Sequence, residues 1–250
     1  MDEGQEFERS VSFVEETKTA VMLLDEGIWC IAQWKGKEAG WYSGEDRRIL
    51  GLFLTSLGLE RFLKLTMTLI LNGEGMDPSS TYFRKRYGHR LVSLLDDILK
   101  KAGADAEVAS SPRLSEDLEF CYSDRHLREM LNILQEFGTG GRYHSLDVFL
   151  DGRSRTDHPI RRWQQLEQSI HDENPSWPEL KQTDKRQWIQ RWYPHLAGKQ
   201  TETLQRTLRF LARLWELEMA WERGLGFRAL DRFLSIEDEY LGTPPQERYF

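Results

Sequence analysis

Cysteine is scarce in this chain, which has only Cys30 and Cys121 among its 250 residues. Neither has a second cysteine nearby, so the spacing fits no zinc knuckle and no redox pair. A disulfide framework is disfavoured for the same reason. We therefore expect both to be small buried side chains in a reducing compartment.

Long hydrophobic runs are also missing. The most apolar stretch, residues 63–71, includes Lys64 and two threonines and is too short to cross a bilayer. The first twenty residues are acidic and have no signal-peptide core. We therefore expect a cytoplasmic protein that has no membrane partner.

The chain has no glycine-rich phosphate loop, no dinucleotide-binding glycine turn and no serine nucleophile elbow. Enzymes that depend on a nucleotide are disfavoured, and we expect no cofactor. The net charge of −7 argues against a surface that binds nucleic acid over its whole extent, but it leaves room for one basic patch. Hydrophobic residues at 39% and nine tryptophans are enough for a well-packed core.

What the sequence does contain is a succession of helical stripes, in which apolar residues recur every three or four positions. Strand patterns are scarce, so the predicted class is all-α, as an irregular multi-helix bundle. The expected helices cover residues 7–35, 45–71, 91–103, 124–137, a stretch beginning at Pro159, a short segment around Trp188 and Trp192, and 201–223. Residues 73–81 and 102–117 are expected to be loops. We predict one domain over 1–250, with 1–137 as the main bundle and 138–250 as a helical extension packed on it.

Two helix starts have recognisable caps. Ser123 is the expected N-cap of the helix that ends at Phe137. Pro159 fits the first position of the next helix, with Asp157 or His158 before it. The second half of the helix over 45–71 is apolar on nearly every side, so we expect it at the centre of the bundle.

One block, residues 57–101, contains a grouping of side chains that indicates a chemistry. Basic residues are interleaved there with aromatic ones: Arg84, Lys85, Arg86, His89 and Arg90, with Tyr82, Phe83 and Tyr87 between them. Basic side chains hold phosphate groups and aromatic rings stack on bases, so the block suits a nucleic acid. In RNA cleavage without a metal, His89 would move a proton and Arg84 would stabilise charge on the phosphate oxygens. Lys85, Arg86, Tyr87 and Arg90 would help to bind the RNA.

The five-residue spacing of Arg84 and His89 sets their directions if both lie on one helix. Their side chains would then point about 140° from each other. They could line opposite walls of one groove or meet their copies across a two-fold axis. The same spacing recurs at Arg153 and His158, so the spacing alone has little weight. The alternative interpretation is a solvated helix start with a packed or capping histidine.

The block around Arg84 and His89 resembles the HEPN superfamily, the helical domains of many prokaryotic toxins and defence ribonucleases. The signature of that family is an arginine, a polar residue, three further residues and a histidine at a helix start. Lys85 stands here at the polar position. Residues 88–91, Gly-His-Arg-Leu, also resemble a segment of HEPN-like proteins that are not known to cleave RNA.

That resemblance covers residues 50–101 and, by helix order, residues 7–137. It implies a HEPN-like homodimer that cleaves RNA without a metal, with the two grooves facing each other. The alternative is a non-catalytic HEPN-like protein that binds a protein or nucleic-acid partner through the same groove.

A second polar cluster lies in a glycine-flanked stretch without a clear period. Its candidate site residues are Arg142, His144, Asp147, Arg153 and His158. Polar groups on such a segment could bind a ligand, or they could form an ion-pair network between the two halves of the chain. The spacing matches no common set of metal ligands, so we expect no metal site.

Overall fold

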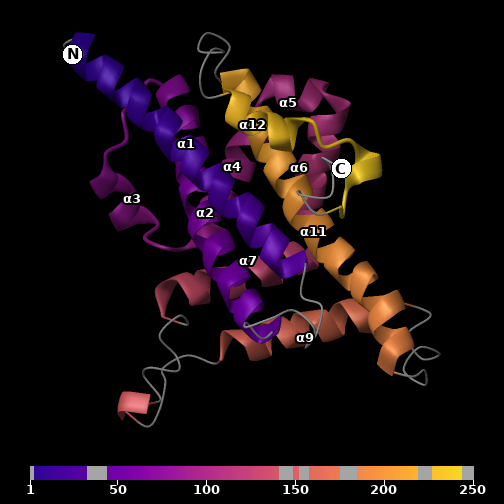
Figure 1. Ribbon diagram of the computed structural model, residues 1–250. Helices are drawn as coiled ribbons and strands as arrows, with labels where there is room; N and C mark the ends of the chain where they lie inside the picture. Colours follow the sequence, from indigo (N-terminus) through magenta and orange to yellow (C-terminus); the bar gives the residue numbers. More distant parts are fainter. Residues whose placement is uncertain are drawn as a thin grey trace. The chain divides into compact units, whose positions relative to one another are not determined.

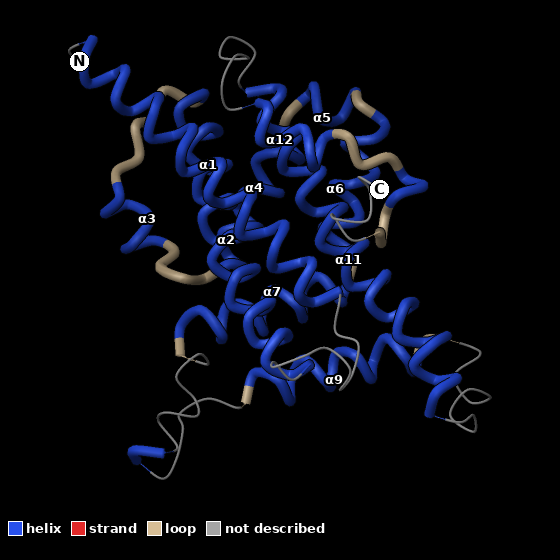
Figure 2. Tube along the Cα trace, in the orientation of Figure 1, coloured by secondary structure: helices blue, strands red, loops and turns tan. Residues whose placement is uncertain are grey.

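The computed structural model describes residues 3–32, 44–140, 149–151, 158–174, 185–218 and 227–243. Throughout these ranges the regular secondary structure is helical and no strand is present, which confirms the all-α class (Figures 1 and 2). No helix within them combines the length and the apolar character needed to span a bilayer.

The helices follow one another with short connections over most of the chain. They are α1 (Glu3–Ala32), α2 (Gly44–Gly73), α3 (Ser80–Arg86), α4 (Leu91–Gly103), α5 (Ala106–Ser110), α6 (Pro112–Ser123), α7 (Arg125–Thr139), α9 (Pro159–Asp172), α11 (Lys185–Glu218) and α12 (Phe227–Leu234), with a 3-10 turn, η3 (Asp238–Tyr240).

The chain forms two compact units, each assembled from separate stretches of sequence. The first unit consists of residues 1–24, 57–123 and 205–237, and the second of residues 25–56, 124–204 and 238–250. Each unit draws on residues from both sides of the division that we expected at Phe137. The prediction of one domain over residues 1–250, divided into a bundle and an extension at Phe137, therefore stays a prediction.

The core of the first unit is built on the apolar half of α2, as predicted. Phe62 has no exposed surface, and its ring stacks on Trp215 of α11 at 4.9 Å between centroids. Phe233 of α12 packs edge-on against Phe62 at 5.9 Å. The indole Nε1 of Trp215 donates a hydrogen bond of 2.7 Å to Thr66 Oγ1, so this large side chain is buried without losing its polar partner.

In the second unit, α1 and α2 approach each other backbone to backbone. A Cβ on Gly27 would lie 2.4 Å from Oγ1 and 2.7 Å from the amide nitrogen of Thr55. A Cβ on Gly51 would lie 3.0 Å from the carbonyl oxygen of Gly27. Only glycine allows this contact. The two helices therefore cross here at a separation that any other residue would increase.

Two expected boundaries differ from the structure. Residues 102–117, predicted as a loop, contain α5 and the start of α6, because Asp105 caps α5 by accepting hydrogen bonds from the amides of Glu107 and Val108. The N-cap of α7 is Asp124, which accepts from the Leu127 amide at 2.6 Å. Ser123, the expected cap, instead ends α6.

The two helices that we expected around Trp188 and over residues 201–223 are one helix, α11. It runs without interruption through Pro194. Residues 219–223 lie outside the described part of the chain. Helix α12 was not predicted. The start of α9 is as predicted, with His158 as its N-cap and Pro159 at its first turn. Both cysteines are buried thiols, as expected.

Candidate functional site

The candidate site lies in the first unit, where α3 passes into α4. Ser79 begins α3 by accepting a hydrogen bond from the Tyr82 amide. The helix ends at Arg86 because Gly88 adopts a φ of +56°, in the left-handed region that favours glycine. The Gly88 amide then donates to the Phe83 carbonyl at 2.9 Å, which closes the end of the helix.

His89 therefore stands in a turn, directly before α4. Arg84 and His89 do not share one helix, because Gly88 ends the helical path between them, so the angle of about 140° that a common helix would give does not apply. Their placement at the entry to the amphipathic helix α4 is confirmed.

Aromatic side chains fasten α3 to the rest of the first unit. Phe83 and Tyr87 are buried, and their ring centroids lie 6.2 Å apart. The Tyr87 hydroxyl donates to Asp97 of α4 at 2.7 Å. Burial and the Asp97 carboxylate raise the pKa of Tyr87 well above its usual range. The ring of Tyr87 is thus a structural anchor, which corrects the expectation that it is available to bind RNA.

Two of the expected RNA-binding arginines are also engaged within the protein. Arg86 donates to the Tyr87 hydroxyl at 2.9 Å and forms an ion pair of 2.9 Å with Asp97. Burial raises the pKa of Asp97, but the hydrogen bonds from Tyr87 and Arg86 outweigh it and lower that pKa. Arg90 donates to the carbonyl oxygens of Tyr87 and Arg86, at the end of α3. Both arginines stabilise the turn.

His89 is oriented by a carboxylate from α2. Its side chain is 54% exposed, and its Nδ1 lies 2.8 Å from Glu60 Oε2. Glu60 is only 14% exposed, and its other oxygen accepts a hydrogen bond of 2.5 Å from Lys64 Nζ. Burial raises the pKa of Glu60, but the hydrogen bonds from His89 and Lys64 prevail and lower it.

Because Glu60 is ionised, it can only accept hydrogen bonds. The proton of the contact must then belong to His89 Nδ1, and in the neutral ring Nε2 carries a free lone pair. Nε2 is the nitrogen that faces away from Glu60. The Lys64–Glu60–His89 chain therefore presents a proton acceptor on an exposed side chain.

Arg84, Lys85 and Arg86 are all exposed on α3, but Arg86 is engaged with Asp97 and Arg84 and Lys85 are not. In the part of the chain that the structure describes, no carboxylate pairs with either of them. These two side chains, with His89, are the members of the predicted site that remain open to a ligand.

Most of the second predicted cluster lies outside the described residues. Arg142, His144, Asp147 and Arg153 belong to this group. His158 is described, and its Nδ1 accepts a hydrogen bond of 3.3 Å from the Ile160 amide. Its role in the structure is to cap α9.

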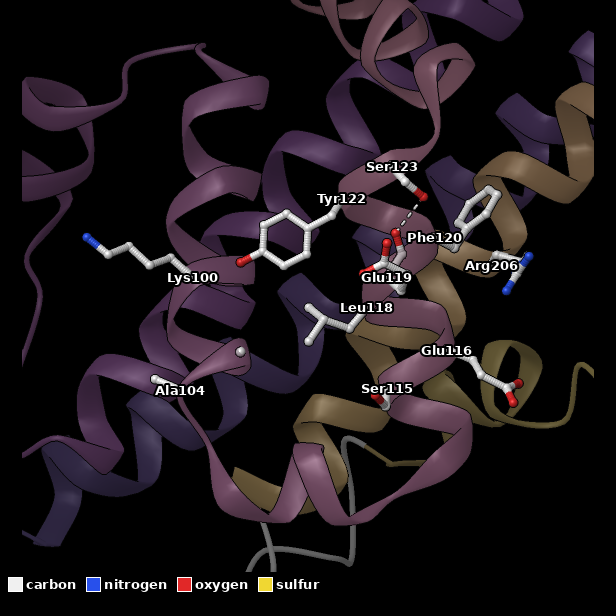
Figure 3. A pocket seen from close by; sticks show the side chains of 11 residues that line it. Lys100, Ala104, Ser115, Glu116, Leu118, Glu119, Phe120, Tyr122, Ser123 and Arg206 are labelled. Atoms are coloured by element: carbon white, nitrogen blue, oxygen red, sulfur yellow. Dashed lines mark hydrogen bonds between the residues drawn. The ribbon is translucent and has the colours of Figure 1, made fainter.

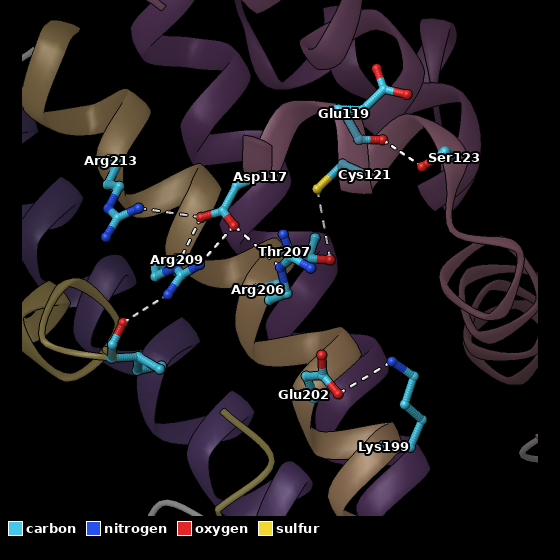
Figure 4. Close-up of polar contacts among 11 residues, drawn as sticks. Asp117, Glu119, Cys121, Ser123, Lys199, Glu202, Arg206, Thr207, Arg209 and Arg213 are labelled. Atoms are coloured by element: carbon cyan, nitrogen blue, oxygen red, sulfur yellow. Dashed lines mark hydrogen bonds and ion pairs between the residues drawn. The ribbon is translucent and has the colours of Figure 1, made fainter. Parts of the chain in front are cut away.

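The sequence did not reveal a buried carboxylate that gathers three arginines of α11. Asp117 of α6 has a side chain only 1% exposed. Arg209 binds both of its oxygens, at 2.7 and 2.8 Å, and Arg206 and Arg213 each approach at 3.3 Å (Figure 4). Arg209 also donates to the Ile236 carbonyl at 3.0 Å. Spacings of three and four residues place all three arginines on one helix face, which was the available signal.

A hollow of about 1060 Å³ lies over α4 and α6. Leu118 and Tyr122 of α6 point toward α4, whereas Phe120 and Arg206 lie on the other side of α6 (Figure 3). Arg206 stacks on Phe120 with its guanidinium carbon 4.2 Å from the ring centroid. The hollow includes neither Arg84 nor His89, and it is a broad surface depression.

Within the described ranges, no group of three or more histidine, cysteine, aspartate or glutamate side chains is placed to hold a metal ion. Comparisons of this chain with protein-family models, curated proteins and solved structures find no match.

Proposed function

We propose that the turn between α3 and α4 is an acid–base site that cleaves RNA without a metal, with His89 as the group that moves the proton and Arg84 as the phosphate clamp. The observation that carries the proposal is the pairing of His89 with Glu60. An exposed imidazole that is fixed through Nδ1 has its Nε2 ready to accept a proton.

The reaction that suits this arrangement is attack by a ribose 2′-hydroxyl on the adjacent phosphate. Nε2 of His89 takes the proton of the 2′-hydroxyl while the bond from O2′ to phosphorus forms. The bond from phosphorus to O5′ breaks, O5′ receives a proton from water, and the protonated His89 gives its proton to the hydroxide that this leaves. Arg84 would stabilise the charge on the phosphate oxygens with its planar guanidinium, and Lys85 would add a second positive charge.

Glu60 and Lys64 are positioning residues in this proposal. In a Glu60→Gln variant, Lys64 can only donate, so the amide oxygen would turn toward it and the amide NH₂ would face His89. Nδ1 would then have to accept a hydrogen bond, and Nε2 would carry the proton. The wrong tautomer removes the base without removing the histidine.

The test of function is incubation of the purified protein with single-stranded and structured RNA in EDTA. We expect cleavage by the wild type, a loss of about 100-fold or more in His89→Ala, and products that end in a cyclic phosphate. RNA that carries 2′-O-methyl groups should stay intact. Arg113→Ala and His195→Ala are the matched controls, because both residues are exposed and lie outside the site. An intact substrate with a folded wild type would refute the nuclease.

The positioning role has a separate readout. Nitrogen NMR of His89 should show the Nδ1–H form in the wild type and the Nε2–H form in Glu60→Gln, whereas Glu74→Gln should leave it unchanged. Glu74 is a fair control because it too accepts from a lysine, Lys101. If the tautomer is the same in all three proteins, Glu60 does not orient the ring, whatever the activity.

A second candidate function is binding without cleavage, of a protein or a nucleic acid. It is favoured by the engagement of Arg86, Tyr87 and Arg90 within the protein, which leaves Arg84 and Lys85 as the unengaged cations of α3. It predicts RNA retention that falls in Arg84→Ala while the RNA stays intact. The homodimer and the cytoplasmic location remain part of the proposal. Light scattering of the purified protein tests whether it is a dimer.

A further inference from the structure

The first turns of α1 expose apolar side chains on the face that bears Phe7. Residues 4–12 are all exposed, with Phe7 at 70% and Val11 at 39%. Phe7 and Val11 lie one helical turn apart on one face, so together they form a small apolar patch that is open to water.

The opposite face of α1 is the one that the protein uses. Arg9 forms an ion pair with Asp77 at 2.5 Å, and the ring of Phe13 lies 5.4 Å from that of Trp215. At about 100° per residue, Arg9 points about 160° from Val11. The contacts that hold α1 in the first unit therefore leave the face of Phe7 and Val11 open.

The open face carries a heptad spacing. Phe7, Val11, Val14 and Lys18 follow one another at intervals of four, three and four residues. We call these four residues the α1 stripe. Val21, the next position in the series, is buried inside the protein, so the stripe ends at Lys18. This is the pattern with which one helix packs along another.

The flanks of the α1 stripe are acidic. Glu8 and Glu15 occupy the positions that border it on one side, and Glu6 lies nearby; all three are exposed. In an antiparallel pair of α1 helices the glutamates would face each other, and in a parallel pair they would meet positions without charge such as Ser10. A second copy thus offers no complementary charge.

We propose that the α1 stripe is a docking site for a partner helix whose apolar stripe is flanked by lysine or arginine. Apolar residues of the partner would cover Phe7 and Val11, and its basic flanks would pair with Glu8 and Glu15. This site is separate from the turn at His89 and does not depend on any nuclease activity.

The test uses two synthetic peptides of about three heptads. Both have leucine at the a and d positions; one has lysine and the other glutamate at the flanking positions. The full-length protein should bind the lysine peptide about tenfold or more tightly than the glutamate peptide, with affinity that falls as salt is added. Fluorescence anisotropy measures both affinities.

Two double variants locate the site. Phe7→Ser with Val11→Ser should weaken binding of the lysine peptide by about tenfold or more, since buried apolar anchors dominate such contacts. Glu8→Lys with Glu15→Lys should reverse the preference between the peptides. These side chains are exposed, so helical content and thermal stability should stay at the wild-type values. Tyr122→Ser, at an exposed aromatic of α6, is the control and should bind like the wild type.

Several outcomes would overturn the proposal. The proposal is wrong if the lysine peptide does not bind, or if the two peptides bind equally well. It is also wrong if the variant with Phe7→Ser and Val11→Ser binds the lysine peptide as the wild type does. A dimer of the wild type that dissociates in that variant would assign the α1 stripe to a second copy of the chain instead.

Discussion

Replacement of Asp117 by asparagine is expected to be among the most destabilising single changes in the first unit. Asp117 is the shared carboxylate of three arginines, of which Arg209 is itself only 5% exposed and binds both oxygens at 2.7 and 2.8 Å. Asparagine keeps the size of the side chain but removes its charge. Three positive groups would then surround a neutral amide in place of a carboxylate.

The magnitude follows from the loss of one partner in a buried ion pair, which typically costs about 3–5 kcal/mol. The two short bonds from Arg209 account for most of it, since bonds to charged groups contribute about 1.5–3 kcal/mol each. The two contacts at 3.3 Å add less. For a chain of this size the melting temperature should fall by about 6–20 °C.

Urea unfolding followed by circular dichroism measures the free energy of unfolding of both proteins. Glu119→Gln is the matched control, because Glu119 lies on the same helix and is exposed; it should change the free energy by less than about 0.5 kcal/mol. If Asp117→Asn costs less than about 1 kcal/mol, the arginines are solvated well enough to do without the carboxylate, and the reasoning is wrong.

Two further predictions concern the second unit. Gly27→Ala should cost about 1–3 kcal/mol in urea unfolding, because the new Cβ would overlap the backbone of Thr55, whereas Gly103→Ala, whose nearest neighbour would be 3.6 Å away, should be neutral or slightly stabilising; equal effects would contradict the close approach of α1 and α2. Burial lowers the pKa of His171 below its ordinary value of 6.5, with a further contribution from His195 and against an adjacent carboxylate. The folded protein therefore binds this proton less readily than the unfolded chain, so the stability from His171 is complete above about pH 6.5 and is lost as the pH falls below it. His171→Gln should flatten the decline of the melting temperature on acidification, and a slope equal to that of the wild type would exclude His171 as its source.

The candidate site shows where sequence reasoning succeeds and where it stops. The stripe of α4 and the basic block before it are local patterns, and both were predictable from spacing. The presence of Gly88 is evident from the sequence, but its positive φ is not, because a glycine can adopt either sign of φ. That choice depends on the burial of Phe83 and Tyr87, which fixes the end of α3.

Glu60 was missed for a different reason. It lies 29 residues before His89, on a helix whose sequence is mostly apolar. The residues next to Glu60 in the sequence do not distinguish it from a solvated glutamate. The same holds for Asp117, whose arginines are 89 to 96 residues away. Residues that come into contact only through tertiary packing have no characteristic spacing in the sequence.

The sequence by itself determined the helical class, the central position of the second half of α2, and the placement of a histidine at the entry to α4. These follow from the apolar period and from capping, which act over a few residues. The tertiary structure alone decided which polar groups are available. It commits Tyr87 and Arg86 to Asp97, holds His89 by one nitrogen and leaves Phe7 and Val11 of the α1 stripe exposed. The physical reason is that exposure and pairing depend on which distant surfaces come into contact, and the free energy of those contacts is a property of the packed chain.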